Sequence, residues 1–73
     1  MADIDWTARA KGLLKAELKR RDIGYRELAE KLALLGINEN ERNLANKISR
    51  GGFSAAFLLQ CLSAIGVETL RLD

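Results

Sequence analysis

The sequence predicts an all-α domain of four helices followed by a short tail. Apolar residues recur at the three- and four-residue spacing of an α-helix over four segments of the chain. Glycines separate these segments, and the chain has no proline that would break a helix. The 73 residues are enough for one small domain and no more, so residues 1–73 are predicted to form a single unit.

The first helix is predicted over residues 5–22. Either Asp5 or Thr7 is placed to cap its start. The basic run Lys19–Arg21 suits the negative end of the helix dipole, and it is more typical of a solvated helix end than of a DNA clamp. Gly12 is unfavourable inside a helix by up to about 1 kcal/mol relative to alanine, so we expect it to pack closely against another helix.

The second helix is predicted over Tyr25–Leu35, with Gly36 in a left-handed cap after its end. The third helix is predicted to begin near Asn38, because Asn38 and Glu41 resemble a capping box, and to stop at a pair of glycines. Its inward side is apolar. The side chains on its outward side are all charged or amides: Glu39, Arg42, Asn43, Asn46, Lys47 and Arg50.

The fourth helix is predicted to start after the cap residue Ser54 and to run to Ile65. It is apolar nearly all round, so it must be covered on more than one side, and a chain this small is not expected to supply all of that cover. In the tail that follows, Leu70 and Leu72 alternate with polar residues, which predicts a short strand or an extended arm.

The residue types exclude most catalytic and metal chemistry. The chain has no histidine, and Cys61 is its single cysteine. A structural zinc site draws its ligands from Cys and His, and Ser-His or Cys-His catalysis needs a histidine base, so we expect no metal, no cofactor and no enzyme activity. No apolar run approaches the roughly 18 residues of a membrane span, and the start MADIDW is unlike a signal peptide, so we expect a cytoplasmic protein.

Positive charge is concentrated in the middle of the chain. The net charge is +2, but residues 9–50 hold eleven basic and six acidic residues, which gives +5 for that segment. The segment includes the whole predicted third helix. This excess favours a polyanionic partner, while an ordinary solvated surface remains the alternative.

The second and third predicted helices together have the sequence form of a helix-turn-helix. Ala29 is small where the next helix must cross closely, and the following helix is rich in amides. Such a second helix lies in the DNA major groove, where Asn pairs with adenine and Arg with guanine. Arg50 and the positive first turn of the second predicted helix can hold phosphates. The alternative for these side chains is ordinary surface and helix-end chemistry.

Three stretches also carry a resemblance to a known family: LKAELKRRDIGYRELAEKL, NKISRGGFS and LLQCLSAIGV. Over residues 14–67 the chain resembles the Cro/C1-type (XRE) helix-turn-helix family, which implies a lambda-repressor-like fold and a small bacterial transcriptional regulator that binds double-stranded DNA. The resemblance also implies roles for individual residues. Tyr25 and Arg26 would touch the DNA backbone, and the groove would be faced by Arg42, Asn43, Asn46 and Lys47. With these roles we expect base readout by Arg42, Asn43 and Asn46, and electrostatic docking by Arg26, Lys47 and Arg50.

A closer resemblance covers nearly the whole chain. The patterns WTARAKGLLKAEL and RNLANKISRGGFSAAFLLQCL resemble a group of short bacterial proteins carried only as a domain of unknown function, which implies no activity. Relative to the helix-turn-helix family, the connection before the third helix is longer than the usual turn of three to four residues.

The fourth helix departs from the family in a way that predicts a partner. Positions that the family leaves polar are here Ala56, Phe57, Gln60 and Ser63. An exposed Ala-Phe pair favours a contact surface, so we expect a homodimer with Ala56, Phe57 and Gln60 in its interface. The alternative function is a protein–protein interaction module that keeps this fold without binding DNA. The modest net charge and the acidic residues Glu39 and Glu41 favour that alternative.

Overall fold

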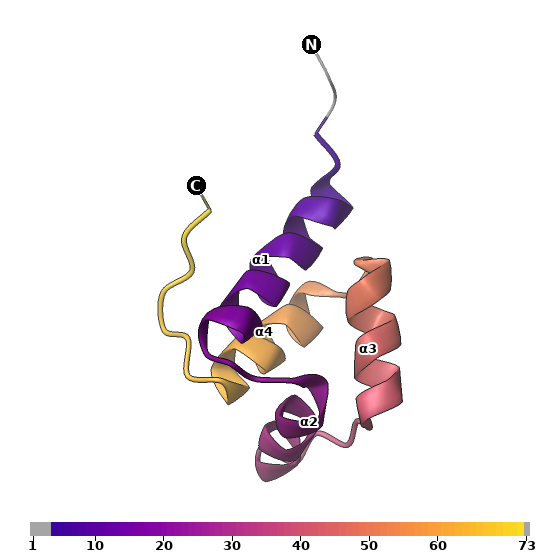
Figure 1. Ribbon diagram of the computed structural model, residues 1–73, viewed down its shortest axis with the longest axis vertical. Helices are drawn as coiled ribbons and strands as arrows, with labels where there is room; N and C mark the ends of the chain where they lie inside the picture. The colour runs from indigo at the N-terminus through magenta and orange to yellow at the C-terminus, as the bar shows by residue number, and fades with distance from the viewer. Residues whose placement is uncertain (1–3, 73) are drawn as a thin grey trace.

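The computed structural model describes residues 4–72, and within them the chain folds into four α-helices with no strand (Figure 1). The helices are α1 (Trp6–Arg20), α2 (Tyr25–Leu34), α3 (Glu41–Arg50) and α4 (Ala55–Ala64). The predicted all-α domain of four helices is confirmed. Among the described residues, α1 and α2 each pack against both α3 and α4.

One apolar core joins the four helices. Its buried members are Leu14, Leu18, Leu28, Leu32, Leu44, Ile48, Phe57, Cys61, Leu62 and Ile65. In α1, α2 and α3 the two buried apolar residues are four positions apart, so each of these helices buries one narrow stripe. The rest of each helix is left for solvent or for a partner.

Three helices end in the same hydrogen-bonded motif. After α2, the N–H groups of Gly36 and Ile37 each donate to a carbonyl of the last helical turn at 3.0 Å, and Gly36 has φ +80°, as the predicted left-handed cap requires. Asp22 after α1 and Gly66 after α4 repeat this arrangement. In each case the next residue is Ile or Val and packs on the core, so the motif turns the chain back inward.

Asn40, and not Asn38, caps α3. The Asn40 side chain accepts a hydrogen bond from the N–H of Asn43 at 2.8 Å, and α3 begins at Glu41. The predicted cap at Asn38 is therefore wrong. The reason lies in the preceding helix. The N–H of Ile37 donates to the carbonyl of Leu32 in α2, so residues 38–40 are needed to carry the chain from α2 to α3. Six residues, 35–40, separate α2 from α3.

The predicted caps of the first and last helices are confirmed. Asp5 accepts a hydrogen bond from the N–H of Ala8 at 3.1 Å, and Ser54 accepts one from the N–H of Phe57 at 3.0 Å. Each bond satisfies a donor that would otherwise be free in the first turn of the helix.

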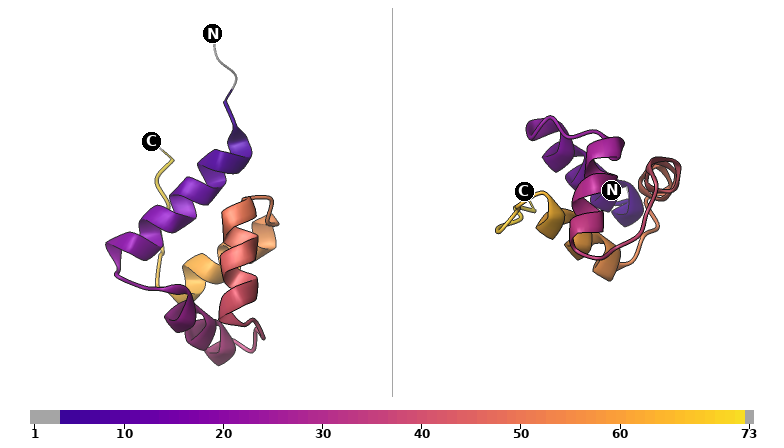
Figure 2. Two further views of the ribbon diagram at one scale, coloured as in Figure 1. Left: turned by 45° about the vertical axis from the view of Figure 1, so that its right-hand side comes forward. Right: turned by 90° about the horizontal axis from the view of Figure 1, so that it is seen from below.

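The tail, residues 67–72, forms neither helix nor strand. It runs back along α1 on the side opposite α3, as both views show (Figures 1 and 2). Arg9 of α1 donates a hydrogen bond to the carbonyl of Leu72, which fastens the end of the tail to α1. Within residues 4–72 no helix combines the length and the apolar character needed to cross a membrane.

Gly12 does not pack against another helix. It is exposed in α1, and a Cβ atom there would meet nothing within 4 Å, so the predicted close approach is wrong. We therefore expect Gly12→Ala to stabilise the domain by about 0.5–1 kcal/mol, because alanine loses less backbone entropy in a helix. Urea unfolding followed by circular dichroism measures the change. Ala16→Gly, at another exposed position of α1, is the control and is expected to lose a similar amount; a destabilised Gly12→Ala variant would contradict the prediction.

Candidate nucleic-acid interface

α3 is the most polar of the four helices. α3 lies on the outer side of the domain, and only Leu44 and Ile48 of its residues are buried (Figure 1). The predicted DNA-binding residues of α3 are all exposed: Arg42, Asn43, Asn46, Lys47 and Arg50. Because Arg42, Asn46 and Arg50 are spaced by four residues, they line one side of the helix.

Four of these side chains have no partner within the described chain. They are Arg42, Asn43, Asn46 and Arg50, and none of them makes a hydrogen bond or an ion pair with another residue of the range 4–72. Their guanidinium and amide groups are therefore available to a ligand. Amide and guanidinium groups can each form two parallel hydrogen bonds to a base edge or to an anion.

Lys47 differs from its neighbours on α3. It follows Leu44 by three residues, so it lies at the edge of the buried stripe. Its ammonium group donates a hydrogen bond to the carboxylate of Glu39 and lies 5.1 Å from the centre of the Phe57 ring. Lys47 is thus held against the domain by two contacts, although its side chain is partly exposed.

The start of α2 lies beside the start of α3. Tyr25, the first residue of α2, is half-buried and lines a hollow together with residues of α3 and its cap. These neighbours are Asn40, Glu41, Arg42 and Ala45. Arg26 is exposed next to it. Gly24 provides no side-chain cap, so the first N–H groups of α2 have no hydrogen-bond partner among the described residues, which favours an anion at this end of the helix.

Two lysines of α1 extend the same surface. Lys15 and Lys19 line a second hollow that also includes Gly24 and Tyr25. Sequence reasoning passed over Lys15 and favoured a solvated helix end for Lys19, because only the left-handed turn at Asp22 brings the two lysines to α2. Their four-residue spacing, which puts both on one side of the helix, was the available signal.

The exposed side of α4 differs from the predicted interface. Ala56 and Gln60 are exposed, but Phe57 is only 7% exposed and packs in the core with its ring centre 5.5 Å from that of Phe53. The prediction that Phe57 is exposed is wrong, because Phe57 shares the buried stripe with Cys61, four residues later. Leu59, which sequence reasoning passed over, is 64% exposed instead.

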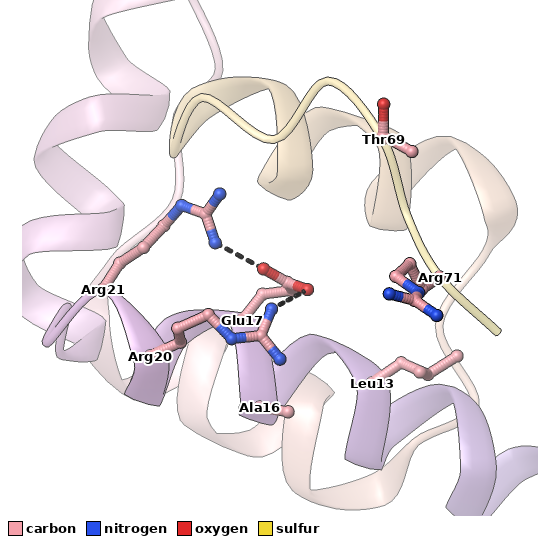
Figure 3. A pocket seen from close by; sticks show the side chains of 7 residues that line it. All are labelled: Leu13, Ala16, Glu17, Arg20, Arg21, Thr69 and Arg71. Atoms are coloured by element: carbon pink, nitrogen blue, oxygen red, sulfur yellow. Dashed lines mark hydrogen bonds and ion pairs between the residues drawn. The ribbon is translucent and has the colours of Figure 1, made fainter. Parts of the chain in front are cut away.

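A charged hollow between α1 and the tail lies away from α3 (Figure 3). Glu17 is buried there and accepts hydrogen bonds from Arg20, at 2.7 Å, and from Arg21; Thr69 and Arg71 of the tail complete the lining. Burial raises the pKa of Glu17, but the hydrogen bonds and charges of the two arginines together lower it by more. The pKa of Glu17 therefore lies below the usual value, and the carboxylate stays ionised. Two guanidinium groups are therefore already engaged inside the domain.

Cys61 offers no reactive thiol. It is fully buried, and its burial, with a smaller effect of the Glu39 charge, raises its pKa to about 11. The thiol is therefore protonated and unreactive at neutral pH. Among residues 4–72 no group of three or more His, Cys, Asp or Glu side chains is arranged to hold a metal ion.

Comparison with known proteins gives one match. The model of the family described as "Domain of unknown function (DUF6471)" matches residues 6–70. No curated protein and no solved structure matches the chain.

Proposed function

The chain belongs to the family described as Domain of unknown function (DUF6471), and we propose that it binds double-stranded DNA sequence-specifically through the exposed face of α3. One observation carries the proposal: the four exposed arginine and asparagine side chains of α3 have no partner among the described residues. If these side chains only had to keep an exposed helix hydrated, lysine and glutamate would serve as well as arginine and asparagine. Amides and guanidinium groups on one side of a helix match the donors and acceptors of the major groove.

In this proposal α2 and α3 act as a helix-turn-helix, and α3 enters the major groove. Readout then falls to Arg42, Asn43 and Asn46, and Arg50 holds a phosphate near the other end of the helix. The unsatisfied first turn of α2, with Tyr25 and Arg26, binds the DNA backbone beside the groove. The role that fits these parts is a small bacterial transcriptional regulator, as the resemblance to the Cro/C1-type family implies.

The salt dependence of DNA binding tests the proposal. We expect the protein to enrich a duplex from a random-sequence pool, and the logarithm of its affinity to fall linearly with the logarithm of salt concentration, by about 0.9 for each phosphate contacted. Fluorescence anisotropy of the enriched duplex at two salt concentrations measures this slope. The alternative, a protein-interaction module, predicts no enrichment and no binding to any duplex.

The exposed side of α4 supports a homodimer as the second part of the proposal. Leu59 is exposed between Ala56 and Gln60, and the α4 sequence AAFLLQCLSA has no charged residue. A two-fold interface pairs a patch with itself, so an uncharged helix avoids the repulsion of like charges. A dimer would also present two α3 helices to successive major grooves, about 34 Å apart.

Leu59→Asp is expected to give a folded monomer. Its side chain is largely solvated in one chain, so the charge disturbs only a face-to-face contact of two α4 helices. Sedimentation equilibrium at tens of micromolar measures the mass, and circular dichroism checks the fold. Phe57→Asp is the matched control and is expected to unfold the domain, because its side chain is buried. A monomeric wild-type protein would contradict the dimer.

A further inference from the structure

The long connection between α2 and α3 is fastened by one ion pair. Glu39 lies in that connection, and its carboxylate accepts a hydrogen bond from the ammonium group of Lys47, eight residues further along the chain in α3. The same ammonium group lies 5.1 Å from the centre of the Phe57 ring, in α4. Lys47 therefore joins the connection, α3 and α4 at one point.

The pair is more protected than an ordinary surface ion pair. The Glu39 side chain is 13% exposed and the Lys47 side chain 47% exposed. Exposed pairs contribute little, whereas removing one partner of a protected pair leaves a charge that water solvates poorly. The effect of Glu39 and Lys47 on the pKa of Cys61 also indicates that both charges lie near the core side of α4.

The pairing changes what each residue offers to DNA. A glutamate just before a reading helix would repel phosphate, but this carboxylate is neutralised by a lysine and turned inward. By the same contact Lys47 is withdrawn from the group of free cations on α3. The basic residues of α3 that are free to bind a phosphate are therefore Arg42 and Arg50, whose side chains make no ion pair with residues 4–72.

We propose that Glu39 and Lys47 are positioning residues, which lock the six-residue connection onto α3 and α4 and so fix the orientation of the reading helix without touching DNA. This inference rests on the proposed function. The orientation of α3 matters because α3 is the reading helix in that function. A turn of three to four residues fixes its two helices by its shortness. A longer connection needs a side-chain contact for the same result.

Hydrogen exchange of the free protein is the first arm of the test. We expect Glu39→Gln and Lys47→Met each to speed exchange of the amides of Asn43 and Leu44, which donate hydrogen bonds to Asn40 at the end of the connection, by about tenfold, because local opening of the connection becomes easier. Lys47→Arg, which keeps the charge and the donor, is expected to restore the wild-type rate. Unchanged exchange in both single variants would overturn the proposal, whether or not the protein binds DNA.

DNA binding is the second arm. With the duplex enriched from the random pool, Glu39→Gln and Lys47→Met are expected to reduce the ratio of specific to nonspecific affinity by about tenfold and to leave the salt slope unchanged. Arg50→Met is the comparison and is expected to lower the slope by about one contact. A slope lowered to the same extent by Lys47→Met, or a specificity ratio unchanged by Glu39→Gln, would overturn the positioning role. Failure to enrich any duplex would contradict the proposed function and leave the first arm to decide this inference.

Discussion

Gly51→Ala is expected to destabilise the domain by about 3 kcal/mol, through both backbone strain and a steric clash. Gly51 follows α3 with φ +77°, a conformation that alanine adopts only at a cost. It is also buried against the first turns of α1, where a Cβ atom would lie 2.9 Å from the backbone oxygen of Thr7 and 3.3 Å from the Cβ of Lys11. Backbone and Cβ atoms cannot move aside without shifting the helix.

Gly66→Ala separates the two effects. Gly66 has φ +84°, almost the same as Gly51, but a Cβ atom there would meet nothing within 4 Å. Strain alone is then expected, at about 1 kcal/mol. Urea unfolding of both variants, followed by circular dichroism, gives the clash as the difference. Equal losses for the two variants would show that Gly51 is required for its φ angle alone.

The close contact at Gly51 also explains how α3 is held. Beside it, the ammonium group of Lys11 donates a hydrogen bond to the carbonyl of Ser49 at 3.1 Å, one of the carbonyls left free at the end of α3. The end of α3 is therefore fixed to α1, while the connection before its start is fixed by the pair of Glu39 and Lys47. The arginine and asparagine side chains on the exposed face of α3 make no hydrogen bond or ion pair with the rest of the described chain.

The helices could be predicted from the sequence because each carries its signal locally. Leucines four residues apart define the buried stripes, and Asp5, Ser54 and Gly36 mark helix ends by hydrogen bonds within a single turn. Asn38 and Asn40 could not be distinguished in this way, since both are good caps. The choice is made by Ile37, whose packing on the core belongs to the end of α2.

The sequence could not predict which apolar side chain of α4 is buried, or which basic side chain of α3 is paired within the domain. On α4 both Phe57 and Leu59 are apolar, and only the packing of α4 in the assembled core decides that the first is buried and the second is not. On α3 both Lys47 and Arg50 are basic. Lys47 is engaged because Glu39 reaches it from the connection and Phe57 from α4, a contact between three elements that no spacing rule describes.

Asn46→Ala is expected to weaken binding to the enriched duplex by about 1–3 kcal/mol and to relax the preference at one base pair. Asn46 lies at the centre of the exposed side of α3, four residues from Arg42 and from Arg50, and its amide has no partner in residues 4–72. Since the amide is solvated in the free protein, its removal leaves folding nearly unchanged. Affinities for a set of duplexes, each with one base pair changed, measure the effect.

The pattern of the loss distinguishes base readout from backbone contact. Loss of a base contact is felt on the enriched duplex and hardly at all on an unrelated one, whereas loss of a phosphate contact weakens both and lowers the salt slope. Asn38→Ala is the matched control, because Asn38 is an exposed asparagine outside α3 that caps no helix. If Asn46→Ala and Asn38→Ala bind every duplex as the wild type does, the exposed face of α3 does not read DNA, and the uncharged side of α4 becomes the surface on which this domain acts.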